Sequence, residues 1–530
     1  MRHYYSVEVI RAAEAPLLAS LPDGVLMRRA AFGLATAIAR ELAARTGGTA
    51  GRNVCAVVGS GDNGGDALWA ATLLRRRGVA ASAILLDPAR AHAKGLAAFR
   101  RAGGRIVDTV PPATDLVIDG VVGISGRGPL RPNAAEVFAA VEAAGIPVVA
   151  VDIPSGLDPH TGAADGPAVN AALTVTFGGL KPVHALGQCG RVELIEIGLD
   201  LPDTDIHSLT AADVEACWPA PGPRDDKYTQ GVTGILAGSA TYPGAAILCA
   251  GAAVAATSGM VRYAGNADAQ VVSHWPEVVA APSPAAAGKV QAWAVGPGLG
   301  TGEQAAAALW FALGTDLPVI VDADALTILA AHPSLVADRT APTVLTPHAG
   351  EYARLAGHPP GPDRVGAARE LADRFGATVL LKGNVTVVAD PSGGSARLDA
   401  GEAKLGAPHE PGGSARLDAG EAKLGAPHEP GGSARLDAGE AKLGPAHQAG
   451  PVYLNPAGGS WAATAGSGDV LSGMIGALLA SGLPPAQAAA AAAFVHTRAA
   501  AASAADPGPG DTPTSASRIL AHIRTALAQL

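Results

Sequence analysis

Acidic side chains occupy three glycine-rich turns in the first part of the sequence, each directly after a run of apolar residues. The first turn contains Asp62 and Asp66, the second begins at Asp119, and the third begins at Asp152. The carboxyl ends of parallel strands meet at one edge of a sheet, so we expect these turns to converge on one crevice. Their backbone N–H groups could bind phosphate, and their oxygens could hold a cation or move a proton. Taken singly, each aspartate would more commonly cap a helix.

A fourth turn, at residues 466–469, reads Gly-Ser-Gly-Asp. Successive backbone N–H groups at a helix start form an anion hole for a transferring phosphoryl group. Asp469 then stands where a carboxylate can take a proton from a substrate hydroxyl. A helix cap needs only one glycine and one aspartate, so we favour the catalytic interpretation. Gly298, His348 and Lys382 lie in further turns that follow apolar strands.

The elements that must position these turns are strands alternating with helices. An opening segment, 7–45, has apolar residues at helical spacing and predicts two helices. The strands and helices predicted next are 53–58, 67–77, 83–86, 116–118, 136–144 and 147–151. A second alternating region predicts strands at 234–237, 292–295, 319–321, 343–345, 378–381 and 385–388. This alternation indicates α/β domains with parallel sheets covered by helices. Pro219, Pro221 and Pro223 predict a linker between the regions.

A tandem repeat interrupts the second region. From residue 394 the unit GGSARLDAGEAKLGAPHEP recurs, so that Ser395, Ser414 and Ser433 stand 19 residues apart. Each copy has too few apolar residues to offset the entropy of ordering it. We therefore predict that 394–448 is a loop insertion at the surface. A dedicated binding array is the alternative.

Composition limits the classes of function. With 530 residues, 48% hydrophobic and 16% charged, the chain can form more than one large core. A formal charge of −9 argues against nucleic acid as a partner. The four cysteines (Cys55, Cys189, Cys217 and Cys249) lack metal-ligand spacing and predict buried or partly buried thiols. No secretory or membrane-spanning pattern is evident, so we expect a cytoplasmic protein without membrane association.

The front turns, with Leu-Met-Arg-Arg-Ala at 26–30 and Leu-Lys-Pro at 180–182, resemble the NAD(P)H-hydrate epimerase domain. The resemblance implies a Rossmann-like three-layer αβα fold for residues 1–215 and epimerisation of hydrated NADH and NADPH. It implies Asp152 as the acid/base residue and Lys181 as its helper. The implied potassium ligands are Asn63, Asp119 and Ser155. The residues implied to line the substrate are Asp62, Asn63, Gly64, Gly65, Asp66, Gly123, Ile124, Ser125, Gly126, Arg127, Gly128, Pro129 and Asp152.

After a linker at 216–227, residues 228–530 resemble the ADP- or ATP-dependent NAD(P)H-hydrate dehydratase, a member of the ribokinase-like superfamily. The resemblance implies a ribokinase-like α/β domain in which the nucleotide, with Mg²⁺, phosphorylates the C6 hydroxyl of the hydrated nicotinamide. Loss of phosphate then restores the dihydropyridine. The implied substrate contacts are Ala245, Gly298, His348 and Asp469, with Asp469 catalytic. The implied nucleotide contacts are Lys382, Gly383, Asn384, Val385, Thr386 and Gly468.

Two other functions stay open at this point. The second region alone is compatible with a small-molecule kinase acting on a vitamin precursor or a sugar. The first region could be a non-catalytic binding module, with the repeats as a docking site. The sequence also leaves open the preference for NADH or NADPH, the choice of ADP or ATP, and the oligomeric state, including a homo-oligomer.

Overall fold

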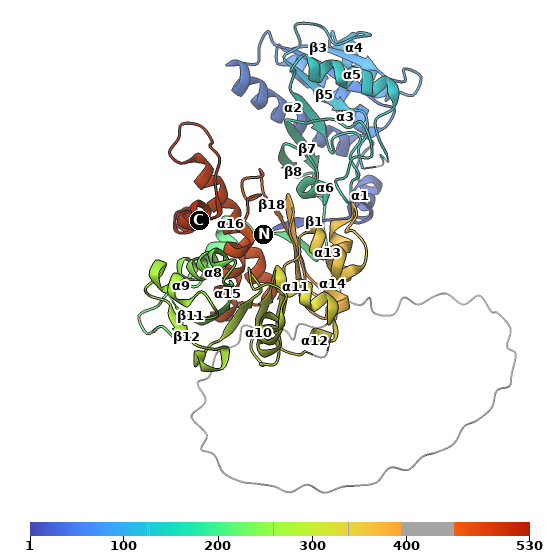
Figure 1. The fold of residues 1–530 in the computed structure, drawn as a ribbon. Coiled ribbons are helices and arrows are strands. Elements are labelled where there is room, and N and C mark those ends of the chain that lie inside the picture. Colours follow the sequence, from blue (N-terminus) through green and yellow to red (C-terminus); the bar gives the residue numbers. More distant parts are fainter. Residues whose placement is uncertain (125, 127, 258, 338, 394–449) are drawn as a thin grey trace, which may run out of the picture.

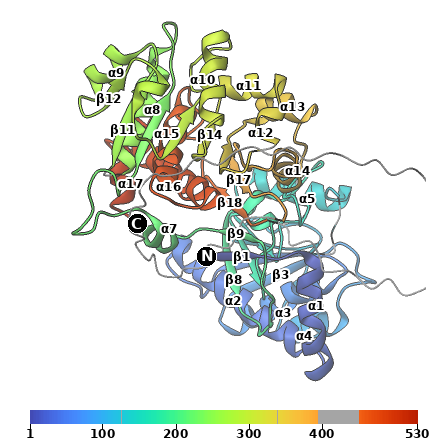
Figure 2. The ribbon, with the colours of Figure 1, turned by 90° about the horizontal axis from the view of Figure 1, so that it is seen from below.

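The computed structural model describes residues 1–530 except 125, 127, 258, 338 and 394–449. Two β-sheets, each packed between helices, form the molecule (Figures 1 and 2). The predicted α/β fold class is confirmed for both parts of the chain. The predicted repeat insertion, and the predicted substrate contacts Ser125 and Arg127, lie outside the described residues.

The first sheet has seven parallel strands in the order β4-β3-β2-β5-β6-β7-β8. The strands are β2 (Asn53–Val58), β3 (Ala80–Leu85), β4 (Arg105–Ile106), β5 (Leu116–Gly120), β6 (Val148–Val151), β7 (Leu173–Phe177) and β8 (Arg191–Ile195). The central strands are apolar and buried, as expected for a sheet covered on both faces. The chain leaves β2 toward β3 on one side and reaches β5 on the other, which is a switch point where α/β sheets bind ligands.

Six helices belong to this part of the chain. They are α1 (Val7–Ser20), α2 (Val25–Thr46), α3 (Asp62–Arg76), α4 (Ala93–Arg101), α5 (Pro132–Ala143) and α6 (Val183–Leu186). The prediction that the helix after β2 starts at residue 67 was wrong, because α3 begins at Asp62 with Gly61 as its N-cap. Glycine and aspartate are poor helix formers in general, but the first turn of a helix tolerates them. The front turn therefore presents the start of a helix to the crevice.

The second sheet has 11 strands in the order β1-β9-β18-β17-β16-β15-β14-β13-β10-β11-β12. They are β1 (Arg2–Tyr4), β9 (Ile206–Ser208), β10 (Val232–Leu236), β11 (Met260–Ala264), β12 (Val279–Ala281), β13 (Ala292–Val295), β14 (Val319–Val321), β15 (Thr343–Leu345), β16 (Thr378–Leu381), β17 (Val385–Ala389) and β18 (Val452–Pro456). The sheet is mixed, because β17 pairs antiparallel with both β16 and β18. The repeat segment lies in the chain between β17 and β18.

Helices cover this sheet on both faces. They are α8 (Pro243–Ala256), α9 (Asp268–His274), α10 (Glu303–Leu313), α11 (Asp324–Ala331), α12 (Ser334–Ala337), α13 (Ala349–Ala356), α14 (Arg364–Phe375), α15 (Ser467–Ala480), α16 (Pro485–Ala505) and α17 (Ala516–Leu527), with α7 (Ala211–Cys217) before β10. Helices α8 and α15 pack very closely, because a Cβ on Gly473 would stand 2.1 Å from the Cys249 carbonyl oxygen. Within the described residues, no helix combines the length and apolarity needed to cross a bilayer. The predicted buried or partly buried thiols are confirmed.

The N-terminal strand connects the two sheets. Strand β1 pairs antiparallel with β9, and β9 pairs in parallel with β18, so both strands join the second sheet (Figure 2). Tyr4 is buried in the core of that sheet and also bridges to Leu180 beside the first site. The Ser208 hydroxyl donates to the Leu454 carbonyl oxygen (2.6 Å) and lies 3.0 Å from the Tyr4 hydroxyl. Residues before 215 thus contribute to both sheets, and the division at 215 stays a prediction.

Candidate active sites

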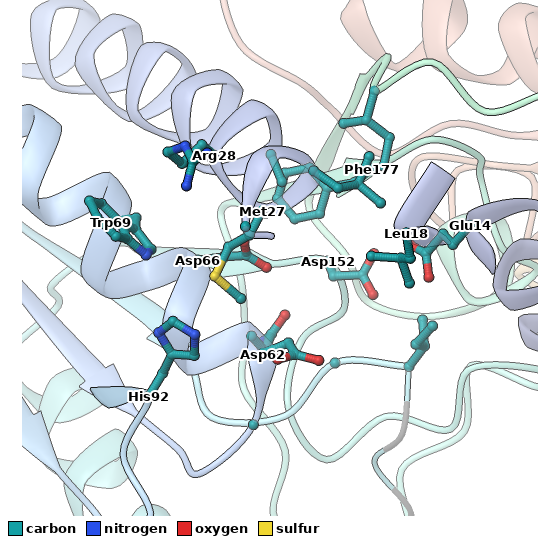
Figure 3. A pocket seen from close by; sticks show the side chains of 18 of the residues that line it. Glu14, Leu18, Met27, Arg28, Asp62, Asp66, Trp69, His92, Asp152 and Phe177 are labelled. Atoms are coloured by element: carbon teal, nitrogen blue, oxygen red, sulfur yellow. The ribbon is translucent and has the colours of Figure 1, made fainter. Parts of the chain in front are cut away.

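A cavity of about 1120 Å³ opens at the carboxyl edge of the first sheet (Figure 3). Helices α1 and α2, the start of α3, and the loops after β5 and β6 form its wall. Of the residues predicted to line the substrate, the wall contains Asp62, Asn63, Asp66, Gly123, Ile124 and Asp152. Sequence reasoning missed several other wall residues, namely Glu14, Met27, Arg28, Trp69, His92 and Phe177. Met27 and Arg28 belong to the 26–30 motif on α2, whereas the other four lie on separate elements with no shared motif, so only the fold brings them together.

Not every predicted substrate residue reaches this wall. Gly64 and Gly65 are buried beneath it, where a Cβ would stand 2.4 Å from the Gly59 carbonyl oxygen and 2.9 Å from Cε of Met27, respectively. Their role in the structure is close packing of α3. Gly126, Gly128 and Pro129 also lie outside the cavity wall, and the latter two are exposed. Contact of these five residues with a substrate stays a prediction.

Asp152 and Lys181 form a buried ion pair in the cavity. Lys181 Nζ donates to Asp152 Oδ1 at 2.6 Å, and the Thr176 hydroxyl donates to the same oxygen at 2.9 Å. Burial raises the pKa of Asp152, but the Lys181 charge and these hydrogen bonds outweigh it and hold the pKa below its usual value. Asp152 also has a φ of 67°, a strained conformation for a residue other than glycine. The structure thus presents an ionised carboxylate in a constrained position.

His184, which sequence reasoning missed, contacts the backbone of both residues of this pair. Its Nδ1 accepts the Lys181 backbone N–H at 2.9 Å, and its Nε2 lies 2.8 Å from the Asp152 carbonyl oxygen. Burial, followed by the Lys181 charge, lowers the pKa of His184 to about 4, so the ring is neutral. The tautomer that satisfies both contacts carries its proton on Nε2. One ring therefore fixes the backbone on both sides of the ion pair.

Two further carboxyl groups of the cavity have raised pKa values, which favour their protonated forms. Burial raises the pKa of Asp66 well above its usual value, and the charges of Asp152, Asp62 and Glu14 raise it further. Burial likewise raises the pKa of Glu14 on α1, although the Lys181 charge opposes this. The cavity therefore places Asp152, whose pKa is lowered, beside two carboxyl groups whose pKa values are raised.

The three predicted potassium ligands lie together behind the cavity. Asp119 is fully buried and accepts hydrogen bonds from the Ser155 hydroxyl (2.7 Å) and the backbone N–H groups of Ser155 (2.8 Å) and Val121 (3.2 Å). Burial raises the pKa of Asp119 to about 6, and no cationic side chain in the described part of the chain pairs with it. Asn63 Nδ2 donates to the Val151 carbonyl oxygen at 3.0 Å, so its Oδ1 remains to accept. A buried carboxylate beside neutral oxygens fits a monovalent cation.

The second site lies at the start of α15. Gly466, with a φ of 82°, is the N-cap, and Asp469 lies in the first turn. Burial raises the pKa of Asp469 to about 7, and the Asp322 charge adds to this while the Lys382 charge opposes it. Asp469 is therefore suited to take up and release a proton near neutral pH. His496, missed by sequence reasoning, anchors the turn through Nε2, which lies 3.1 Å from the Ser467 hydroxyl and 3.0 Å from its carbonyl oxygen.

Lys382 belongs to a buried charge network beside this turn. Its Nζ lies 2.8 Å from Asp322 Oδ1 and 3.6 Å from Glu351 Oε2. The hydroxyls of Thr346 (2.8 Å) and Ser472 (2.6 Å) donate to the two Asp322 oxygens. Burial raises the pKa of Asp322, but the Lys382 charge and the hydrogen bonds bring it below its usual value. The predicted nucleotide contact thus has its ammonium bound to two carboxylates, whose roles the sequence did not reveal.

Gly468, at the start of α15, lies beside this charge network. A Cβ on Gly468 would stand 3.6 Å from Lys382 Nζ and 3.8 Å from Asp322 Oδ2. Gly383 and Asn384 are exposed after β16, whereas Val385 is buried in the core, with its backbone paired to Pro456 in β18. Thr386 is partly buried in the same strand. The structure therefore groups Lys382 and Gly468 at the start of α15, and contact of Gly383, Asn384, Val385 and Thr386 with a nucleotide stays a prediction.

Gly298 and Ala245 also meet at the carboxyl edge of the second sheet. Gly298 has a φ of 63°, and a Cβ there would stand 2.6 Å from Cβ of Ala245. His348 is the N-cap of α13, where its Nδ1 accepts the backbone N–H groups of Gly350 (2.9 Å) and Glu351 (3.3 Å). Its side chain remains 56% exposed, and its Nε2 lies 3.4 Å from Glu351 Oε1. Contact of these residues with the hydrated cofactor stays a prediction.

Comparison with known proteins covers both parts of the chain. A family described as NAD(P)H-hydrate dehydratase matches residues 233–407 and 438–522, and a family described as YjeF-related protein N-terminus matches 23–183. The chain is 71% identical to a bifunctional NAD(P)H-hydrate repair enzyme of Mycobacterium tuberculosis, with 100% of both chains covered. It is 34% identical to the enzyme of that name in Corynebacterium glutamicum, covering 91% of this chain and 87% of the relative.

Solved structures resemble a part of the chain. An ADP/ATP-dependent NAD(P)H-hydrate dehydratase from Bacillus subtilis, co-crystallised with ATP/Mg²⁺, is 25% identical with a TM-score of 0.43. It covers 61% of this chain and 100% of that chain. The α/β folds predicted for the two parts are confirmed, with a parallel sheet in the first part and a mixed sheet in the second.

Proposed function

The chain belongs to the family of bifunctional NAD(P)H-hydrate repair enzymes, and from this premise we propose that it restores hydrated NADH and NADPH in two steps. The first part interconverts the R and S hydrates, and the second part dehydrates the S form with ADP or ATP. The observation that supports this assignment is the presence of a separate acid/base site on each sheet, Asp152 with Lys181 on one and Asp469 on the other.

In the first site, the Asp152 carboxylate is the proton acceptor. Lys181 keeps it ionised, and Thr176 and His184 hold the pair in place. The cavity of about 1120 Å³ leaves room for a ligand of about the size of a dinucleotide, and its wall carries basic as well as acidic side chains. Asn63, Asp119 and Ser155 would hold potassium, which would neutralise the buried Asp119 carboxylate and fix the loops after β5 and β6.

In the second site, Asp469 takes the proton from the C6 hydroxyl as that oxygen accepts a phosphoryl group from the nucleotide. The backbone N–H groups at the start of α15 stabilise the transferring phosphoryl group, helped by the positive end of the helix. Mg²⁺ would bind together with the nucleotide phosphates and would offset their charge, because this ion retains much of its water and needs few protein ligands. Departure of phosphate from C6, with loss of a proton from C5, restores the dihydropyridine.

The test uses a mixed pool of R and S hydrates, Mg²⁺ and either ADP or ATP, with absorbance of the reduced nicotinamide as the readout. We expect full recovery with the wild-type chain and none with Asp469→Asn. Asp152→Asn should recover the S fraction quickly and the R fraction only at the rate seen without enzyme. Failure of the wild type to recover the cofactor, with phosphorylation of a vitamin precursor instead, would contradict the proposal. Comparing the recovery rates with ADP and ATP, and with hydrated NADH and NADPH, determines the preferred nucleotide and the preferred cofactor.

A further inference from the structure

Asp66 is the most unusual polar group of the front cavity. It lies on α3, in the cavity wall, and is only 9% exposed. Its Oδ1 has no hydrogen-bond partner in the described residues. A buried carboxyl oxygen without a partner is costly to the folded protein, so its retention in a ligand cavity suggests a partner supplied by the ligand.

The charges around Asp66 are mainly negative. Asp152, Asp62 and Glu14 all act on it, and Figure 3 shows these four carboxyl groups around the same space. Lys181 is bound to Asp152 Oδ1 and Thr176. The cavity wall also carries Arg11, Arg28, His92 and Lys94, but the charges that shift the pKa of Asp66 are those of the three acidic neighbours. Burial and its acidic neighbours therefore raise the pKa of Asp66, while Lys181 lowers that of Asp152. Two carboxyl groups with opposed protonation states are a common arrangement for an acid and a base.

We propose that Asp66, as the protonated acid, is a second catalytic residue of the epimerase site and donates a proton to the departing C6 hydroxyl of the substrate. This inference rests on the epimerase function proposed above. Asp152 is less suited to that role, because its Oδ1 already accepts from Lys181 and Thr176 and the group is ionised. Asp62 is exposed at the first position of α3, so it lacks the buried, unpartnered oxygen that distinguishes Asp66.

The chemical step balances with these two residues and water. Asp66 gives its proton to the C6 hydroxyl, and the C6–O bond breaks with both electrons on the departing water. The N1 lone pair forms an N1=C6 double bond, which leaves a flat iminium. Water then attacks C6 from the other face, the π electrons return to N1, and Asp152 takes the proton of that water. A proton passes from Asp152 back to Asp66 through water in the open cavity, and no oxidant or reductant is needed.

The experiment measures epimerisation of purified R hydrate by the full chain, at several pH values, against a control without enzyme. Asp66→Asn keeps the shape and can donate a hydrogen bond, but it cannot transfer a proton. We expect kcat for epimerisation to fall at least about 100-fold, with KM changed by less than about threefold. The wild-type rate should fall at high pH as Asp66 ionises, and this alkaline limb should be absent in the residual rate of Asp66→Asn.

Controls separate this inference from misfolding and from failure of the proposed function. Asp108→Asn, at an exposed position of the same part of the chain, should retain wild-type epimerisation. The rate of S-hydrate dehydration by the same Asp66→Asn chain reports whether the chain is folded. If that rate is lost, Asp66→Glu is used as the test variant instead, and it should retain partial epimerisation. Normal epimerisation by Asp66→Asn, with Asp152→Asn inactive, would overturn the role of Asp66 alone. No acceleration by the wild type would overturn the epimerase assignment itself.

Discussion

Replacing Asp469 by asparagine should abolish dehydration and, at the same time, stabilise the protein at neutral and alkaline pH. Burial, with the charge of Asp322, raises the pKa of Asp469 from 3.8 to about 7. The folded state thus binds this proton more tightly than the unfolded state, and stability falls as the pH rises from about 4 through about 7. Once Asp469 is fully ionised, this rise in pKa corresponds to a loss of roughly 4 kcal/mol in the free energy of unfolding. We take about 2 kcal/mol as the lower bound of this loss, because the site is partly open to solvent.

The assay is thermal unfolding of the wild type and Asp469→Asn between pH 4 and pH 8, with dehydratase kinetics on the same samples. At about pH 4 the two should unfold at nearly the same temperature, since the carboxyl group is then protonated in the folded protein. At pH 8 the variant should unfold roughly 5 °C higher, and its dehydratase kcat should be at least about 100-fold lower. The wild-type dehydratase rate should fall below about pH 7, where the base becomes protonated.

Asp108→Asn supplies the matched control, because it removes an exposed carboxylate and should leave both the unfolding temperature and the rate unchanged at every pH. A variant that gains no stability at pH 8 relative to pH 4 would show that Asp469 is not held in a desolvated, negatively charged environment. Retention of the wild-type dehydratase rate would refute its role as the base. Either result would contradict the link drawn here between its burial and its chemistry.

Four further changes have defined outcomes. Lys181→Met leaves the buried Asp152 carboxylate unpaired and should destabilise the first sheet by roughly 3–5 kcal/mol, measured by hydrogen exchange of β6 and β7. The control Arg40→Met, which removes an exposed ion pair, should cost less than about 1 kcal/mol. Tyr4→Ala should cost roughly 3–5 kcal/mol and expose the amides of β9 and β18 in the second sheet, while Tyr4→Phe should cost much less. Replacing potassium by an organic cation should slow epimerisation but not dehydration. In Asp119→Asn the epimerisation rate should no longer depend on potassium. Equal epimerisation rates of the wild type in both salts would contradict the predicted potassium site. Replacing 394–448 by a short glycine–serine turn should leave both activities unchanged, because Ala389 and Val452 are already paired across β17 and β18; a large loss of activity would refute the passive-loop prediction.

Much of the fold follows from local patterns in the sequence. The strands at 53–58, 292–295, 319–321, 343–345 and 378–381 were predicted with the ends that the structure shows. The glycine-rich turn after the strand at 53–58 located Asp62 and Asp66 at the sheet edge, because a strand, a glycine-rich turn and a helix form a contiguous signal. The short strands β1 and β9 were missed, since three residues carry too little periodicity to be recognised.

The sequence by itself thus determined two α/β halves and the turns that hold the principal acid/base residues. Only the tertiary structure decided which of those residues are ionised. Lys181 pairs with Asp152 and Lys382 with Asp322 across long stretches of chain, and the burial of Asp66 and Asp469 depends on helices from distant segments. A protonation state depends on desolvation and on neighbouring charges, and both are set by contacts that no local pattern encodes.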